Sequence, residues 1–228
     1  MAARASDLSI IVPTLDEELV LGETLAHLCA VGPDVEVSDG GSRDATRAVA
    51  GRFPVTWVAG PAGRGLQLNR GARAARGDVL LFVHADTRLP AGAGGLIGSA
   101  VAKGAVGGGF EVRFDSDRRL MALGSRLASL RTRWTRVPLG DQGQFVRREI
   151  FERLGGYRDW PILEDLDFMR RLRREGEVAV LDAAVLTSDR RFAQRGVVRT
   201  LATNYTIWTL FALGVHPRRL ARLYRDVR

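Results

Sequence analysis

Cysteine and lysine are nearly missing from this sequence. Cys29 is the single cysteine, so the chain can form no internal disulfide and no cysteine-based zinc site. Lys103 is the single lysine, and the other basic residues are arginines spread along the chain. The formal charge of +8 therefore points only weakly to an anionic partner, and nucleotide phosphates, an acidic membrane surface and RNA all satisfy it.

Long apolar runs are also lacking. The longest uncharged stretch, residues 200–216, is interrupted by Thr203, Asn204, Thr206 and Thr209 and falls short of the roughly 20 apolar residues that a membrane span needs. The amino terminus has no apolar core of the signal-peptide kind before the first strand pattern. We therefore expect a cytoplasmic protein. The helix over 197–213 and the arginines after it also allow a peripheral contact with the inner membrane face.

The first third of the chain alternates between strand and helix patterns. Strands are predicted at 8–13, 35–37, 55–58 and 79–83, with helices at 17–30 and 65–75 and a short one ending at Ala50. Such alternation predicts an α/β fold with a Rossmann-like, mostly parallel sheet flanked by helices. A length of 228 residues suits one domain.

The later part of the chain is less regular. Helices are predicted at 91–103, 120–130, 148–154, 165–174 and 197–213 and after Pro217, with strands at 110–114, 144–146, 178–181 and 184–188 and a glycine turn at 107–109. No repeat or linker separates this part. We therefore expect one domain in which residues from about 91 onward are laid over the half that residues 1 to about 90 form.

Polar clusters follow three of the predicted strands. They are Pro13-Thr14-Leu15-Asp16-Glu17, Asp39-Gly40-Gly41-Ser42 and His84-Ala85-Asp86. Because the carboxyl ends of parallel strands meet at one edge, we expect a nucleotide to bind there and Asp86 to hold a metal. Each cluster also has a local interpretation: Asp86 and Asp16 as helix caps, Asp39 as the closure of a turn, or Asp86 in a turn with Thr87.

A glycine-containing segment, residues 63–71, lies between the third and fourth predicted strands. Arg64, Gln67 and Asn69 are predicted to reach a base or phosphate, although a glycine turn followed by a polar helix face fits equally well. The chain has no Walker-type Gly-Lys-Ser/Thr, which argues against ATP-driven phosphoryl transfer.

Two further clusters lie late in the chain. Trp160 and Pro161 precede Glu164 and Asp165, a setting that suits a general base held near a substrate hydroxyl, or simply acidic residues opening a helix. Arg190, Arg191 and Arg195 could clamp a diphosphate, or form a solvated basic face.

The ordered series of motifs is similar to that of the family-2 glycosyltransferases. It comprises Ile-Ile-Val-Pro-Thr-Leu-Asp-Glu-Glu, Val-Ser-Asp-Gly-Gly-Ser-Arg-Asp-Ala-Thr, Gly-Arg-Gly-Leu-Gln-Leu-Asn-Arg-Gly-Ala, Gly-Asp-Val-Leu-Leu-Phe-Val-His-Ala-Asp-Thr and Leu-Glu-Asp. The resemblance spans most of the chain. It is greatest to short, single-domain bacterial members with His-Ala-Asp-Thr and Gly-Asp-Gln signatures, some of which are assigned to arsenosugar biosynthesis.

This resemblance implies an A-type glycosyltransferase fold, a UDP- or GDP-sugar donor, a divalent metal (Mn or Mg) on its diphosphate and inversion at the anomeric carbon. By motif, Asp165 would be the base, Glu164 would support it and Asp86 would bind the metal. The residues expected to contact the donor are Pro13, Thr14, Glu17, Asp39, Gly40, Arg64, Gln67, Asn69, His84, Ala85, Asp86, Arg190, Arg191 and Arg195.

Residues 91–228 would then form the acceptor-side half, where Asp141, Gln142 and Trp160 are expected to contact an acceptor hydroxyl compound. Two positions depart from the family pattern. Asp16 stands where asparagine is usual, and His84 takes the place of the first carboxylate of the Asp-x-Asp metal motif.

Two other functions compete with a glycosyltransferase. A nucleotidyltransferase would have a phosphate-binding glycine loop after the first strand, where this chain has Pro-Thr-Leu-Asp-Glu. A non-catalytic basic module would bind nucleotide, RNA or an anionic membrane surface through its arginines. For the enzyme we expect no nucleic-acid partner, and an oligomer remains open.

Overall fold

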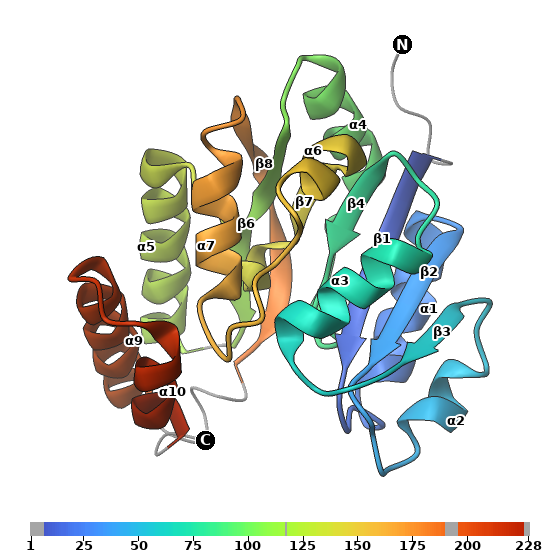
Figure 1. The fold of residues 1–228 in the computed structure, drawn as a ribbon, viewed down its shortest axis with the longest axis horizontal. Coiled ribbons are helices and arrows are strands. Elements are labelled where there is room, and N and C mark those ends of the chain that lie inside the picture. The colour runs from blue at the N-terminus through green and yellow to red at the C-terminus, as the bar shows by residue number, and fades with distance from the viewer. Residues whose placement is uncertain (1–6, 117, 190–195, 226–228) are drawn as a thin grey trace.

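An eight-stranded sheet with helices on both faces forms the body of the computed structural model, which describes residues 7–116, 118–189 and 196–225 (Figure 1). The strand order is β3-β2-β1-β4-β7-β6-β8-β5. The predicted α/β fold with a mostly parallel sheet is confirmed.

The first four strands form the Rossmann-like half. β1 (Leu8–Thr14), β2 (Asp34–Asp39), β3 (Thr56–Ala59) and β4 (Val79–Phe82) pair in parallel and are joined by α1 (Leu21–Val31), α2 (Thr46–Ala50) and α3 (Arg64–Ala74). Every residue of β4 is buried, as expected for an apolar strand covered on both faces.

The strand β7 (Gln144–Arg147) brings a late segment of the chain to the end of β4. It pairs antiparallel with β4, so that Phe82 lies opposite Gln144. The segment that leads into β7, a 3-10 turn over Gly140–Gln142, therefore lies at the same edge as the end of β4. This pairing joins late parts of the chain to the strand ends of the first half.

Two sequence predictions are wrong for the next strands, a glycine turn at 107–109 and a break between 181 and 184. β6 (Gly107–Asp115) includes the three glycines that were predicted to form a turn. A Cβ at Gly107 would lie 2.4 Å from the Phe145 carbonyl oxygen, and one at Gly108 would lie 2.1 Å from that of Ala179. Glycine is thus required here by close strand packing rather than by a turn.

The predicted strands at 178–181 and 184–188 are one strand, β8 (Val178–Ser188). β8 runs parallel to β6 with a register shift between Phe110 and Glu111, opposite the two residues that separated the predicted strands. A bulge therefore produced the apparent break. The short β5 (Thr87–Arg88), which was not predicted, pairs antiparallel with β8.

Apolar side chains form one core on each face of the sheet. On one face α1 and α4 (Ala93–Ala102) pack Leu25 and Ile97 against β1 and β4. On the other, α3, α6 (Arg148–Arg153) and α7 (Glu164–Leu172) pack around Phe82 and Phe168. Both layers hold the strand ends in fixed positions.

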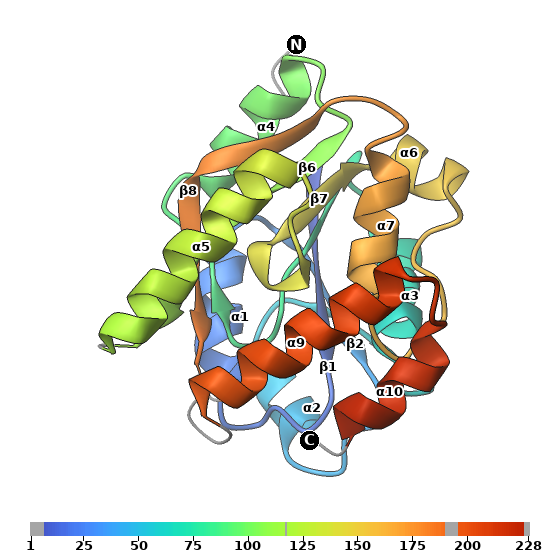
Figure 2. The ribbon, with the colours of Figure 1, turned by 90° about the vertical axis from the view of Figure 1, so that its left-hand side faces the viewer.

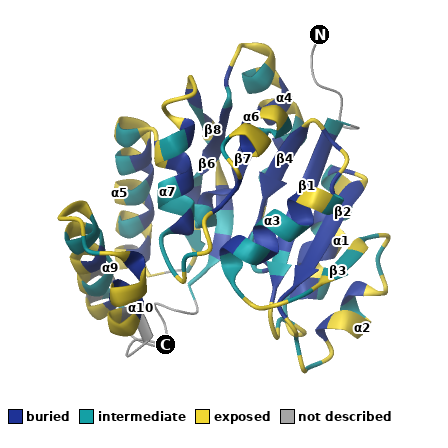
Figure 3. Ribbon diagram, viewed as in Figure 1, coloured by how far each residue is buried: buried dark blue, intermediate teal, exposed yellow. Residues whose placement is uncertain are grey.

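Three helices form the outer side of this body: α5 (Arg119–Thr135), α9 (Val197–Ala212) and α10 (Pro217–Arg225). Figure 2 shows α5 and α9 on the side of the molecule that faces the viewer. Much of their surface is exposed (Figure 3). Within the part of the chain that the structure describes, no helix combines the length and apolar character needed to cross a membrane.

Candidate active site

The predicted strand-end clusters lie at one edge of the sheet. Thr14 and Asp39 are register partners at the ends of β1 and β2, and the Gly40 N–H donates to the Thr14 carbonyl at 2.9 Å. Next to them, the Val83 N–H donates to the Ile11 carbonyl, which carries the chain from β4 into His84-Ala85-Asp86. The first half thus presents its polar residues together.

Hydrogen bonds join the segments 14–18 and 39–46, which we call the donor-side loops after the donor contacts predicted for them. The Asp16 N–H donates to Ser42 Oγ at 2.9 Å, and the Arg43 N–H donates to Asp16 Oδ1 at 2.8 Å. Asp16 has a φ of 54°, a left-handed conformation that Asp and Asn tolerate better than most residues. Its carboxylate therefore links two loops and does not cap α1.

The start of α1 is also set by these loops. The predicted helix began at residue 17, but α1 begins at Leu21. Thr46 Oγ1 accepts the Glu17 N–H at 2.8 Å, and Asp44 Oδ2 accepts that of Glu18 at 3.1 Å. Residues 17–20 are held as a turn instead of a helix, which keeps Glu17 at the strand edge.

Asp39 closes a turn, as its local interpretation predicts. Its carboxylate accepts the N–H groups of Gly41 at 2.8 Å and of Ser42 at 3.0 Å. The alternative role of Asp86 as a helix cap is wrong, because α4 begins after Gly92 and has no side-chain cap. Asp86 is half-buried at the sheet edge.

Two side-chain amides of α3, those of Gln67 and Asn69, bind backbone groups of neighbouring segments. Gln67 is buried, donates to the carbonyls of Thr14 at 2.8 Å and Ser38 at 3.0 Å, and accepts the Gly63 N–H at 3.2 Å. Asn69 exchanges two hydrogen bonds, both 2.8 Å, with the backbone of Tyr157. These contacts give both residues structural roles. Their predicted contacts with a donor stay predictions.

Asp165 lies beside His84 at the centre of the edge. The Gly140 N–H donates to Asp165 Oδ2 at 2.7 Å, and the Leu166 N–H donates to Oδ1 at 2.7 Å. A Cβ at Gly140 would lie 3.1 Å from Asp165 Oδ2 and 3.2 Å from His84 Nε2. The absence of a side chain at Gly140 therefore lets the histidine and the carboxylate approach the same point.

Glu164 is the most perturbed acid of this site. Its side chain is 2% exposed and lies 3.6 Å from Arg64 Nε of α3. Burial raises the pKa of Glu164 to about 7; Asp165 adds to this effect and Arg64 opposes it. The preceding Leu163 has a φ of 66°, so the backbone enters α7 in a conformation unfavourable for leucine. We call Leu163, Glu164 and Asp165 the base segment, after the role of base that is predicted for Asp165.

The predicted acceptor residues are placed differently from one another. Gln142 is fully buried, and its amide donates to the Phe110 carbonyl at 2.9 Å and accepts the Leu139 N–H at 2.9 Å. It therefore secures the 3-10 turn. Asp141 and Trp160 are half-buried. Trp160 packs against Phe211 of α9, with ring centroids 5.9 Å apart.

One residue of the site was not predicted from the sequence. Arg131 of α5 lies over the Trp208 ring, 5.2 Å from its centroid, and donates to Gln142 Oε1 at 3.0 Å. Burial lowers the pKa of Arg131, whereas the charges of Asp141 and Asp165 raise it. In an arginine-rich chain no local pattern distinguishes it. Arg190, Arg191 and Arg195 lie outside the described residues.

A divalent metal fits this edge only if the donor supplies most of its ligands. Among the residues that the structure describes, no three His, Cys, Asp or Glu side chains cluster as a metal site. Mg²⁺, however, is commonly bound by one or two carboxylates together with substrate phosphates and water. Asp86 offers one such carboxylate at the place where a diphosphate is expected.

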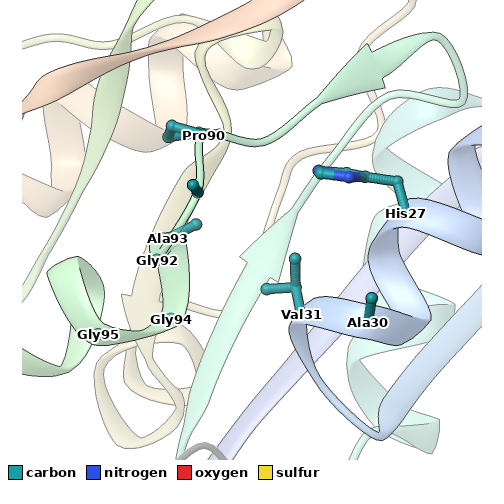
Figure 4. Close-up of a pocket in the computed structure, with 9 residues that line it drawn as sticks. His27, Ala30, Val31, Pro90, Gly92, Ala93, Gly94 and Gly95 are labelled. Atoms are coloured by element: carbon teal, nitrogen blue, oxygen red, sulfur yellow. The ribbon is translucent and has the colours of Figure 1, made fainter.

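A pocket of about 390 Å³ lies elsewhere, between α1 and the start of α4. Figure 4 shows His27 and Val31 on one side and Pro90 and Gly94 on the other. His27 Nε2 lies 3.1 Å from the Leu89 nitrogen and 3.0 Å from the Leu89 carbonyl oxygen, and no charged side chain lines the pocket. Such a lining does not suit a diphosphate.

The family of the chain follows from comparison with known proteins. The profile described as Glycosyl transferase family 2 matches residues 9–156, which is well over half of the chain. The chain belongs to this family. A comparison with curated proteins finds no match.

Solved glycosyltransferases share the fold. The structure is similar to TarS 1-349 from S. aureus in complex with UDP-GlcNAc, with a TM-score of 0.64 and 18% identity over 81% of this chain and 59% of that one. It is similar to the mannosyltransferase PcManGT from Pyrobaculum calidifontis, with a TM-score of 0.58 and 18% identity over 82% and 59%.

A third similar structure is glucosyl-3-phosphoglycerate synthase from Mycobacterium tuberculosis, with a TM-score of 0.59 and 20% identity over 84% of this chain and 75% of that one. The chain spans about three fifths of the length of the TarS and PcManGT structures. At these identities, the likeness shows the fold alone.

Proposed function

We propose that this protein transfers a sugar from a UDP- or GDP-sugar to an acceptor hydroxyl, with inversion at the anomeric carbon. The observation that supports this most directly is the approach of Asp165 Oδ2 and His84 Nε2 to one point beside Gly140, at the edge where the strand-end clusters meet. A family-2 chain with a carboxylate at this edge suits direct displacement by a hydroxyl.

In this proposal the acceptor oxygen attacks the anomeric carbon while the bond from that carbon to the diphosphate oxygen breaks. Asp165 takes the hydroxyl proton, and the nucleoside diphosphate leaves with the bonding electron pair. Inversion requires a single base on the face opposite the leaving group. Glu164 supports Asp165 by holding Arg64 nearby, with Arg64 Nε 3.6 Å from its carboxylate.

Asp86 would hold the divalent cation, with the diphosphate oxygens of the donor as its other ligands. When bound, a cation such as Mn²⁺ or Mg²⁺ stabilises the charge that develops on the leaving diphosphate. Pro13, Glu17 and Asp39 would contact the nucleoside from the donor-side loops. Arg131 and Asp141, on the opposite side, would face the acceptor.

The similar structures support the donor class. TarS binds UDP-GlcNAc in its structure, PcManGT binds GDP-Man with Mn²⁺, and glucosyl-3-phosphoglycerate synthase binds UDP with Mn²⁺. These proteins differ in nucleotide and sugar, so both UDP- and GDP-sugars have to be tested here.

A thermal-shift screen tests the proposal. Binding to the folded protein raises its apparent stability by mass action, so the correct donor should raise Tm with Mn²⁺ and much less with EDTA. Transfer of labelled sugar from that donor to candidate hydroxyl acceptors, followed by assignment of the product anomer, checks the reaction. Retention of configuration, or donor binding that is equal with and without metal, would contradict it.

The basic-module hypothesis makes the opposite prediction. Salt-sensitive RNA binding without binding of any UDP- or GDP-sugar would favour that module over the enzyme.

A further inference from the structure

Helix α5 carries its larger apolar side chains on the side that faces away from the protein. The residues that it turns inward, Met121, Ser125, Ser129 and Thr132, are mostly small and polar. Ser125 and Ser129 bind the backbone of β6, through the N–H groups of Phe114 and Val112. This helix is therefore attached to the sheet largely by hydroxyl groups.

The outward side of α5 forms a continuous apolar stripe. Its members recur at alternating steps of three and four residues, which places them along one face of a helix. They are 49–64% exposed for the leucines and 88% for the tryptophan: Leu120, Leu123, Leu127, Leu130 and Trp134. An exposed stripe of this size marks a contact surface.

The neighbouring helices extend the surface. Arg131 of α5 stacks on Trp208 of α9, and α9 in turn packs against α10. Figure 2 shows α5 and α9 side by side on one face of the molecule. Tyr205 and Leu213 of α9 and Leu223 of α10 are also exposed. We call α5, α9 and α10 together the outer helical surface.

The charge of this surface has one sign. The three helices contain nine arginines and no aspartate, glutamate or lysine. Two of these arginines are engaged within the protein, Arg131 with Gln142 and Arg133 with Glu111 and Asp182. Five others have exposed side chains: Arg126, Arg199, Arg218, Arg219 and Arg222.

We infer that the outer helical surface docks on an anionic phospholipid bilayer, with the α5 stripe inserted among the acyl chains near the headgroups. Apolar side chains next to arginines are the combination that holds interfacial helices on acidic lipids. A second copy of the chain fits poorly, because two such surfaces would oppose arginine with arginine. RNA would leave the leucine stripe in water.

The location of the surface relates it to the site. Phe211 of α9 packs on Trp160, which precedes the base segment. Docking through α9 would therefore bring the acceptor side of the edge close to the bilayer. The inference itself rests on exposure and charge and does not depend on the proposed sugar transfer.

Flotation of the full chain with lipid vesicles tests this inference. At physiological salt we expect recovery with phosphatidylcholine vesicles that contain about 30% phosphatidylglycerol, and little with phosphatidylcholine alone. Raising the salt should reduce recovery, since it screens the arginines. No recovery with the anionic vesicles would overturn the proposal.

Two sets of variants locate the contact. Changing Leu123, Leu127 and Leu130 together to Gln should reduce recovery at least about tenfold, because the stripe loses its apolar area. The matched control is Leu19→Gln, since Leu19 is 87% exposed but lies outside the surface. Unchanged Tm values and donor binding would show that the variants fold.

Changing Arg218, Arg219 and Arg222 to Gln should also lower recovery, whereas changing the exposed Arg47, Arg52 and Arg73 should have a smaller effect. Equal effects of the two arginine sets would overturn the assignment to this surface. A dimer that the leucine variant abolishes, without flotation of the wild type, would assign the stripe to a second copy instead. Because flotation needs no substrate, a failure here is separate from a failure of the proposed activity.

Discussion

The donor-side loops and the base segment meet at one edge of the sheet, yet their polar groups are used differently. In the loops, the carboxylates of Asp16, Asp39 and Asp44 accept hydrogen bonds from backbone N–H groups. In the base segment, Glu164 is buried and has a pKa raised to about 7. The loop carboxylates maintain the shape of the loops, whereas the Glu164 carboxylate is buried and electrostatically perturbed.

This contrast separates carboxylates that hold the shape of the site from an acid whose environment suits a part in the reaction. A carboxylate that satisfies backbone donors stabilises a loop whether or not a substrate is bound. Burial and a neighbouring carboxylate disfavour the charged form of an acid, as they do for Glu164. Residues that are perturbed in this way concentrate at functional sites. Substitutions on the two sides should accordingly differ in what they change: stability on the loop side and turnover on the base side.

The largest effect is expected for Asp165→Asn. The amide can still accept the Gly140 N–H but cannot take a proton, so kcat should fall about 10²- to 10⁴-fold while the Kd of the donor stays within about threefold. Steady-state kinetics and calorimetry measure the two. The control is Asp159→Asn, exposed on the loop before α7. A kcat within about tenfold of wild type would remove Asp165 from the role of base.

A smaller effect is expected for Asp86→Asn. Loss of the charged metal ligand should weaken donor binding in Mn²⁺ at least about tenfold, or about 1.4 kcal/mol. In EDTA, wild type and variant should bind the donor equally. Asp78→Asn, at the exposed opposite end of β4, should behave as wild type. Equal donor affinities in Mn²⁺ would place the metal ligand elsewhere.

On the loop side, Gln67→Leu tests a structural role. It leaves the carbonyls of Thr14 and Ser38 without their amide donor, so the free energy of unfolding should fall by about 2–3 kcal/mol. Urea denaturation measures this loss, with Arg73→Gln on the exposed side of α3 as the control. An unchanged stability with lost donor binding would instead make Gln67 a direct donor contact.

An effect that depends on pH is expected for Glu36→Gln, in the middle of β2. Burial, with the nearby Asp34, raises the pKa of Glu36 from 4.5 to about 8. Between pH 4.5 and about 8, Glu36 keeps a proton in the folded protein that it has released in the unfolded chain. The contribution of Glu36 to the free energy of unfolding is therefore fully present below about pH 4.5 and is lost as the pH rises through about 8.

At pH 8, Glu36→Gln should therefore be more stable than wild type by on the order of 1–2 kcal/mol, and close to it near pH 5. Urea denaturation at several pH values measures the difference. The pKa of Glu164 is also raised, so part of the pH dependence of the stability should remain in the Glu36→Gln variant. The exposed Glu149→Gln is the control, and a parallel pH dependence of wild type and Glu36→Gln would contradict the prediction.

Much of the fold could be predicted because its signals are local. The alternation of apolar strands and helices up to Phe82 indicates a parallel sheet, and parallel strands bring Asp39 and His84 to one edge wherever the later strands lie. By contrast, no local pattern says that β7 lies between β4 and β6. The approach of Gly140 to His84 depends on that long-range pairing.

Side-chain roles were harder to predict than positions. Gln67, Asn69 and Gln142 are polar residues in motifs, which predicts ligand contacts; the structure adds that their amides bind backbone groups inside the protein. A sequence does not show which way an amide points. Likewise Arg131 resembles every other arginine until α5 is placed against the site, and the α5 leucines have the spacing of a core helix although they face outward.

The three glycines of β6 also bear on how this scaffold can be altered. Any side chain at Gly107, Gly108 or Gly109 would overlap the backbone of a neighbouring strand or the Pro138 ring. A mutant library that sought new acceptor preferences would lose folded members at these positions. Diversity is better introduced in residues 158–162, which lie before the base segment and outside the junction between β7 and β8.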